Sequence, residues 1–173
     1  IGGLVSLYIT NKTNNTNYEM KKLEITFNDK KALFSNGIRI LQKIENKRLD
    51  IIFKMGISEK HNIQIDSIAK SYFIANVEGM QKDLQDLNFN VIEISPYCPK
   101  SKLRLTQHVN GIRNSYDDFY ISVAKKNGLF VETYRYNPSD TLKLPTIDNE
   151  LNKKTQNYII YLTDTVYNEI FLN

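Results

Sequence analysis

The feature that most constrains this 173-residue chain is a set of apolar side chains that recur every three or four residues after position 67. This spacing places them on one face of an α-helix. The set comprises Ile68, Tyr72, Phe73, Val77, Met80, Leu84 and Leu87. The sequence therefore predicts a helix that begins at Ser67, packs against a core and ends at Asn88.

Shorter apolar stretches on both sides of this helix predict β-strands. Further helices are predicted over 29–46, 105–112 and 148–171. Strands are predicted over 1–10, 18–27, 49–55, 63–66, 91–94, 119–123 and 129–136. In the middle of the chain, strands and helices alternate, and this order favours parallel pairing with right-handed crossovers. The predicted fold class is α/β, with a mixed sheet flanked by helices.

Composition predicts one domain spanning residues 1–173. The chain is 41% hydrophobic and 11% aromatic, which suffices for one sizeable core. Because it begins with Ile1 rather than methionine, we expect it to be part of a longer chain. Residues 1–10 are mostly apolar but too few to span a bilayer, so a membrane location is not expected. The single cysteine, Cys98, favours a reduced intracellular setting.

One acid occupies a position that is typical of a ligand or metal site. Asp66 ends the predicted strand 63–66, and side chains at the carboxyl end of a strand in an α/β sheet project into a binding crevice. The alternative is that Asp66 only caps the helix that follows. Position alone leaves both open.

The chain is most polarised between Tyr97 and Tyr116, where no acidic residue occurs. The whole chain has a formal net charge of +4, and this stretch favours an anionic partner and suits phosphate contacts. Its basic candidates are Lys100, Lys102, Arg104 and Arg113, and Lys125 and Lys126 add a basic tip to a predicted hairpin at Asn127-Gly128. The alternative is an ordinary solvated helix face.

The order of these parts resembles the nuclease domain of phage terminase large subunits, which has an RNase H-like fold. The resemblance rests on Ile-Gln-Ile-Asp-Ser-Ile-Ala-Lys at 63–70, on Leu-Asn-Phe-Asn-Val-Ile-Glu-Ile-Ser-Pro at 87–96, on Lys100-Ser101-Lys102 and on Val-Asn-Gly-Ile at 109–112. The segments 129–136 and 145–149 resemble the family's Glu-and-Tyr segment and the approach to its last helix. The likeness covers the chain from about residue 63 onwards.

This resemblance implies metal-dependent cleavage of double-stranded DNA during viral genome packaging, in the cytoplasm of an infected host cell. Two Mg²⁺ or Mn²⁺ ions held by carboxylates would activate water and stabilise the leaving oxygen. It implies that Asp66 binds metal and that the basic residues contact DNA. For the remaining acids the candidates are Asp148, Glu150 and Asp164, with Asp148 as a second metal ligand and Asp164 in the catalytic set. Implied partners are an ATPase domain and a portal or small terminase subunit, with no small-molecule cofactor.

Two alternatives stay open. A catalytically degenerate RNase H-like domain would bind nucleic acid or a partner protein, because residues 1–10 lack an acid and Tyr158 and Tyr161 occupy the start of the last helix. A membrane-tethered extracytoplasmic interaction domain is the other, and an N-terminal helix projecting from the body would favour it. His61 and His108 are too isolated for a zinc site.

Overall fold

The computed structural model describes residues 2–61, 67–126 and 144–172, and none of these residues lies in a β-strand. The long helices are α1 (Gly2–His61), α2 (Ser67–Ile94), α3 (Lys102–Lys126) and α4 (Leu144–Tyr161). A 3₁₀ turn, η1 (Ser95–Tyr97), separates α2 from α3. A π-helical turn, η2 (Leu162–Val166), joins α4 to the terminal helix α5 (Tyr167–Phe171).

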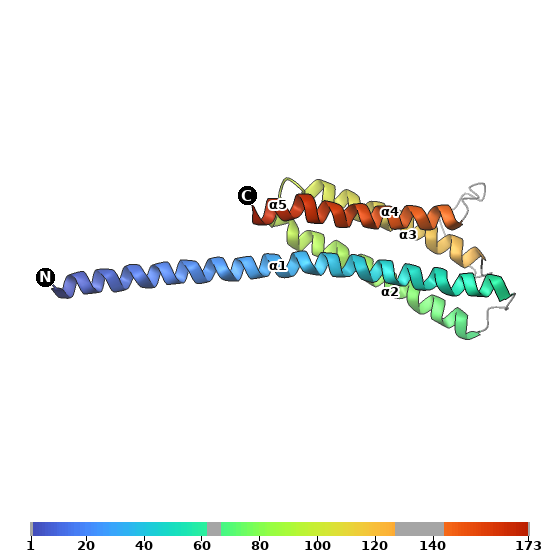
Figure 1. Ribbon diagram of the computed structural model, residues 1–173, viewed down its shortest axis with the longest axis horizontal. Helices are drawn as coiled ribbons and strands as arrows, with labels where there is room; N and C mark the ends of the chain where they lie inside the picture. Colours follow the sequence, from blue (N-terminus) through green and yellow to red (C-terminus); the bar gives the residue numbers. More distant parts are fainter. Residues whose placement is uncertain (1, 62–66, 127–143, 173) are drawn as a thin grey trace.

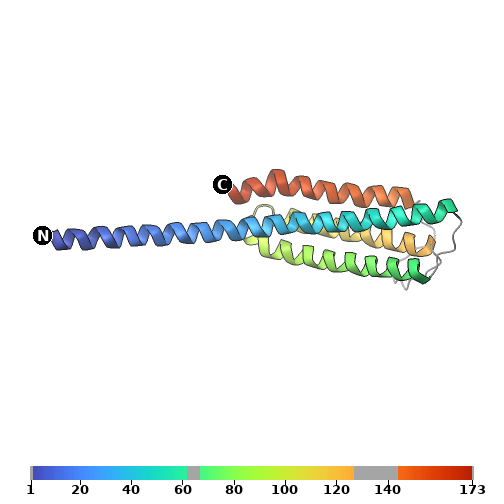
Figure 2. The same cartoon turned by 60° about the horizontal axis from the view of Figure 1, so that its bottom comes forward.

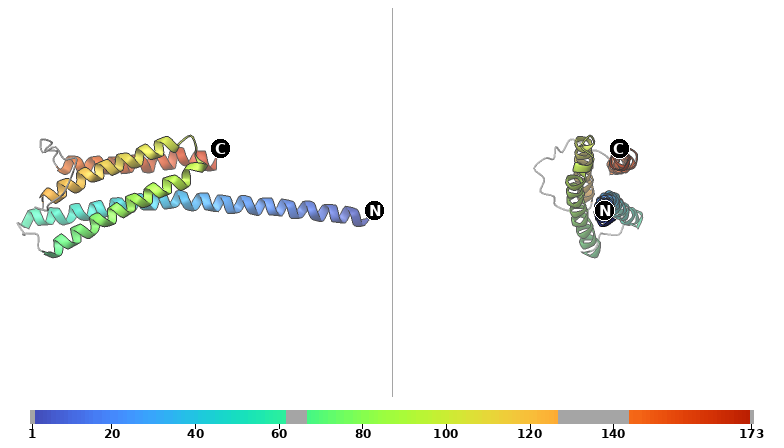
Figure 3. Two further views of the ribbon diagram at one scale, coloured as in Figure 1. Left: turned by 180° about the vertical axis from the view of Figure 1, so that it is seen from behind. Right: turned by 90° about the vertical axis from the view of Figure 1, so that its left-hand side faces the viewer.

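The four long helices form an up-and-down bundle in which each helix runs antiparallel to the one before it (Figures 1 and 2). The end-on view in Figure 3 shows α1 and α4 on one side of the bundle, with α2 and α3 on the other. Only α1 extends beyond the others. Its N-terminal half passes the end of the bundle where the α2–α3 turn and the C-terminus lie, and continues as a single projecting helix.

The core forms because apolar side chains at helical spacing on all four helices face a common axis. From α1 it takes Ile40, Leu41, Ile44 and Ile51, and its largest fully buried side chains include Tyr116 and Phe119 of α3 and Tyr158 of α4. Removing this apolar surface from water is the main contribution to folding. The core lies within the bundle, and the large apolar side chains Met20, Leu23 and Phe27 of the projecting half are not part of it.

Helices α1 and α2 are in close contact at Gly37. A Cβ atom at Gly37 would lie 2.6 Å from Oδ1 of Asn90 on α2. Asn90 is buried, and its Nδ2 donates a 2.9 Å hydrogen bond to the Leu33 carbonyl of α1. Glycine at this position therefore permits the contact, whereas its low helix propensity alone would argue against a helix here.

The predicted α/β fold, with its RNase H-like mixed sheet, is wrong. The segments 18–27, 49–55, 91–94 and 119–123, each predicted as a strand, are helical in the structure, and so are residues 2–10. The segments 63–66 and 129–136 lie outside the described residues. Short apolar runs cannot be assigned to strand or buried helix from periodicity alone, and here each run is one or two turns of a longer helix.

The helix predictions fared better. A helix begins at Ser67 as predicted, but it continues past Asn88 to Ile94. The predicted helix 29–46 lies within α1, the predicted helix 105–112 lies within α3, and the predicted helix 148–171 corresponds to α4, η2 and α5. Long periodic segments were therefore identified correctly, while their ends and the short runs between them were not.

The resemblance to terminase nuclease domains and the nuclease function drawn from it are overturned by the same finding. An RNase H-like domain positions its acids on a mixed sheet, and an all-helical bundle has no such sheet. The degenerate RNase H-like alternative fails for the same reason. A helix projects from the body, as expected for the tethered alternative, but no helix in the described ranges is both long and apolar enough to cross a membrane.

Candidate functional site

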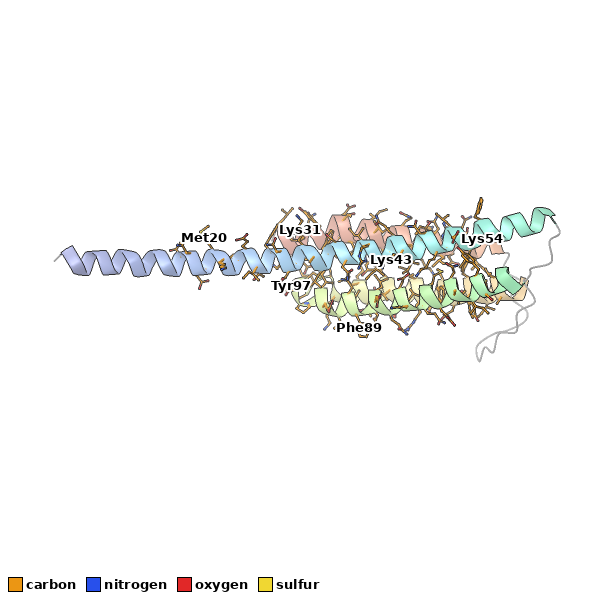
Figure 4. The ribbon with its side chains drawn as sticks, turned by 90° about the horizontal axis from the view of Figure 1, so that it is seen from below. Met20, Lys31, Lys43, Lys54, Phe89 and Tyr97 are labelled. Carbon is orange, nitrogen blue, oxygen red and sulfur yellow. The ribbon has the colours of Figure 1, made fainter. Side chains whose placement is uncertain are left out.

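The first candidate surface is the projecting half of α1. Met20, Leu23 and Phe27 are 64%, 69% and 51% exposed, although all three are large apolar side chains. Steps of three and four residues place them on one face of the helix, which we call the α1 stripe. Figure 4 shows Met20 on the part of α1 beyond the bundle, with no neighbouring helix beside it. Ile25 is 54% exposed on the opposite face.

At the foot of the projecting helix, aromatic side chains join the α1 stripe to the end of the bundle. The ring of Phe27 packs edge-on against Phe171, at a centroid distance of 5.4 Å. Phe34, one turn deeper in α1, packs edge-on against Tyr167 and Phe171. An open groove runs along this junction and is lined by Leu23, Glu24, Thr26, Phe27, Lys30, Ile170 and Phe171. The α1 stripe therefore leads directly into an apolar groove.

The second candidate surface is a cleft between α3 and α4, which we call the basic cleft. It is lined by Arg104, Gln107, His108 and Gly111 from α3 and by Lys154 and Asn157 from α4. The α3 residues recur at helical spacing and so share one face. Two side chains of the lining are permanently cationic, and none is acidic.

Aromatic stacking fixes His108 at the edge of this cleft. Its ring stacks on Tyr158 at a centroid distance of 5.1 Å and on Tyr161 at 4.9 Å. The guanidinium carbon of Arg104 lies 5.2 Å from the centre of the Tyr161 ring, within the range of a cation–π contact. Burial lowers the pKa of His108, and the positive charge of Arg104 lowers it further. Both effects favour the neutral form of the imidazole.

Two buried side chains in the core, Tyr158 of the stack and Cys98, have raised pKa values. Tyr158 is fully buried, and its hydroxyl has no hydrogen-bond partner among the side and main chains that the structure describes. Burial, with smaller contributions from Cys98 and Tyr161, raises the pKa of Tyr158 well above its ordinary value. Burial also raises the pKa of the Cys98 thiol to about 11, with a smaller contribution from Glu169. Because a thiol must ionise and be accessible to react, Cys98 is not a nucleophile in this fold.

Of the predicted acids, the structure describes Asp148 and Asp164 and does not bring these two together. Asp66 lies outside the described residues. Asp148 pairs with Arg48, whose guanidinium also binds Glu45 at 2.6 Å. Asp164 is exposed on η2, sixteen positions along the same continuous helix from Asp148, which corresponds to more than about 20 Å.

No metal site forms in the described part of the chain. Within residues 2–61, 67–126 and 144–172, no three side chains of His, Cys, Asp or Glu are grouped so that they could hold an ion. The predicted Mg²⁺ or Mn²⁺ thus has no such group here. The pairing of Asp148 with Arg48, which is buried, is a link between α1 and α4.

The predicted basic residues do not form one strip. Lys102 and Arg113 are exposed and share one face of α3, whereas Arg104 lies towards α4 and lines the basic cleft. The backbone N–H of Lys100 donates to Glu169 at 2.7 Å, as does the hydroxyl of Ser101 at 2.6 Å. This carboxylate ties α5 to the start of α3. The side chains of Lys125 and Lys126 lie outside the described residues.

Sequence reasoning missed both candidate surfaces. The basic stretch was recognised, but α3 was expected to be short, so the helical spacing of Arg104, His108 and Gly111 was not compared with the last helix. The residues of the α1 stripe were assigned to a strand because Leu23, Ile25 and Phe27 alternate. Their three- and four-residue steps, from Met20 to Leu23 to Phe27, were the available signal.

Comparison of the chain with protein-family models, with curated proteins and with solved structures gives no match.

Proposed function

We propose that this protein is a helical assembly module, in which the projecting half of α1 pairs with the same segment of a second copy of the chain. The four-helix bundle is the rigid base that holds this segment away from its own core. The observation that carries the proposal is the α1 stripe, a face of exposed apolar side chains that runs on from the buried face of the same helix.

The register of α1 continues without a break from the core into the stripe. Inside the bundle, Phe34, Leu41 and Ile44 follow steps of seven and three residues. Met20, Phe27 and Phe34 follow one another at intervals of seven residues, so all three occupy the same heptad position. A stripe with this spacing packs against another helix by inserting side chains into its holes. In the bundle that other helix is present, whereas beyond the bundle a second chain would have to supply it.

Local sequence gives a second reason to expect a partner. Nine of the sixteen residues from 2 to 17 are Gly, Asn or Thr, all poor helix formers. Isolated helices are marginal in water even when their sequences favour them, and most helical stability in proteins comes from packing. Pairing would supply the packing that the projecting segment lacks within its own chain.

Charges along the stripe favour an antiparallel pair. In a parallel pair in register, Glu19 would lie across from Glu24 of the second copy, and like charges at these flanking positions repel. An antiparallel pair avoids this contact. In this pair, Met20 of each copy lies opposite Leu23 of the other copy.

Antiparallel pairing also fits the shape of the molecule. The two bundles would sit at opposite ends of the pair, because Met20 opposite Leu23 sets Phe27 of each copy opposite Thr16 of the other, which separates the two Phe27 residues by about 16 Å along the helix axis. The N-terminal part of each α1 would then run over the groove at the foot of the other, where Leu23, Phe27 and Phe171 are available.

Sedimentation equilibrium over a wide range of protein concentrations tests the proposal. We expect a monomer–dimer equilibrium that Leu23→Glu abolishes, because a carboxylate would enter the apolar seam. Ile25→Glu adds the same charge to the opposite face and should leave the equilibrium unchanged. A wild-type chain that stays monomeric at every concentration would exclude self-pairing.

Disulfide trapping tests the orientation. Met20→Cys and Leu23→Cys chains are oxidised together, with the native Cys98 retained because it is fully buried. The antiparallel pair predicts mixed disulfides between the two variants. A parallel pair would give disulfides within each variant instead, and this outcome would reject the orientation while leaving self-pairing intact.

A further inference from the structure

We infer that the basic cleft binds the phosphoryl group of a small molecule, as a dianion held between α3 and α4. This site lies on the bundle, and it is independent of the α1 stripe and of the assembly proposed above.

The charge of the lining matches a dianion. Arg104 and Lys154 contribute positive charges from opposite walls, and no acidic side chain lines the cleft; Lys154 also pairs at 3.5 Å with Glu150, a carboxylate outside the lining that is 54% exposed. A carboxylate would neutralise only one of these charges, whereas a phosphoryl dianion neutralises both. Arginine suits this role because its planar guanidinium can donate two parallel hydrogen bonds to two phosphoryl oxygens.

The donors for such a ligand are largely uncommitted. Arg104 forms no ion pair with a carboxylate in the described ranges, and its recorded contact is with the face of Tyr161. Lys154 donates to the Ser115 hydroxyl at 2.7 Å and lies 3.5 Å from an oxygen of Glu150. An ammonium group has three N–H donors, so Lys154 retains capacity for a ligand.

Neutral donors complete the lining. Gln107 and Asn157 are exposed amides on the two walls, and each can donate from an NH₂ group. Gly111 lies beside Lys154, and a Cβ there would be in ordinary van der Waals contact with Cδ of Lys154 at 3.8 Å. Together these groups offer several N–H donors to an anion that has only acceptor oxygens.

His108 reports on the occupancy of the site. The charged and titratable groups beside it are Arg104 on its own helix and Lys154, Tyr158 and Tyr161 on α4. A bound dianion would offset the cation that now lowers the pKa of His108, so the pKa should rise on binding. The chain has only two histidines, and His61 therefore serves as an internal reference.

The experiment follows the two imidazole resonances by NMR while inorganic phosphate is added at constant ionic strength. We expect saturable shifts of the His108 resonance, with His61 unmoved. Arg104→Gln should weaken phosphate binding by at least about tenfold, which is typical for the loss of a charge-assisted hydrogen bond. Lys102→Gln removes the same charge from another face of α3 and should bind like wild type.

Two further arms test the ligand class. Sulfate, whose charge is constant between about pH 5 and 8, should raise the pKa of His108 at saturation in the wild type but not in Arg104→Gln. Acetate should bind at least about tenfold more weakly than phosphate.

Three outcomes would overturn the inference. The first is a His108 resonance that phosphate does not shift. The second is an equal response in Arg104→Gln and wild type, since that would be general screening. The third is acetate binding as tight as phosphate, which would remove the assignment to a dianion.

Discussion

The two halves of α1 carry similar apolar side chains but lie in opposite surroundings. In the C-terminal half, Leu41 and Ile44 have no exposed surface, because they face the core of the bundle. In the N-terminal half, Leu23 keeps 69% of its surface exposed. The C-terminal half of α1 thus contributes side chains to the core, whereas its N-terminal half exposes them to solvent. The spacing of apolar side chains therefore identifies a face that packs against another helix, but it does not show which chain supplies that helix.

The largest contrast between the halves should appear on truncation of one leucine in each. We expect Leu41→Ala to lower the free energy of unfolding by about 2–5 kcal/mol, because it leaves a cavity in a packed core. Leu23→Ala should change the free energy of unfolding of the monomer by less than about 0.5 kcal/mol, as surface changes usually do. Urea denaturation at low protein concentration measures both. Equal losses would mean that the projecting half is packed in the monomer.

A smaller effect should come from Gly37→Ala at the close approach of α1 and α2. Alanine favours a helix by up to about 1 kcal/mol over glycine, but its Cβ would lie 2.6 Å from Oδ1 of Asn90. Displacing Asn90 would break its bond to the Leu33 carbonyl, so we expect a net loss of about 1–2 kcal/mol.

The double variant Gly37→Ala/Asn90→Ala sharpens this test. If the clash causes the loss, adding Gly37→Ala to Asn90→Ala should cost less than adding it to the wild type. Asn28→Ala, at an exposed site in the projecting half, should instead be neutral or slightly stabilising in the same urea assay. A stabilising Gly37→Ala would show that the helices are not in close contact there.

The smallest effect should be a pH dependence that arises in the bundle through His108. The pKa of His108 is lowered in the folded state, so below about pH 6.5 the unfolded chain binds more protons than the folded chain. The free energy of unfolding therefore decreases as the pH is lowered. His108→Gln should remove this part of the loss. The difference in urea midpoint between wild type and His108→Gln should therefore change between about pH 7.5 and 5.5, and a constant difference would contradict it.

How much of the fold the sequence predicted depended on the length of each periodic segment. The seven apolar residues from Ile68 to Leu87 gave the start of α2 correctly, since only a helix fits so long a spacing. Residues 91–94 were misassigned because three apolar residues within four positions fit a strand as well as one helical turn. In the α1 stripe, Ile25 on the outer face completed an alternation with Leu23 and Phe27 that suggested a strand.

The candidate sites were less predictable than the helices. Arg104, His108 and Lys154 are separated by up to 50 positions in the chain, and only the antiparallel packing of α3 on α4 makes them neighbours. The packing of α4 on α1 pairs Asp148 with Arg48, which is 100 positions away in the chain, so a residue predicted to bind metal is half of an ion pair.

The sequence by itself determined that the chain has long amphipathic helices and a stretch without acids between Tyr97 and Tyr116, because spacing and charge are local properties. Only the tertiary structure decided that these helices form a bundle and leave one half of α1 projecting. It also decided which charges face a cleft and which face each other. The physical reason is that burial and charge pairing depend on distances between helices, and those distances follow from packing the core as a whole.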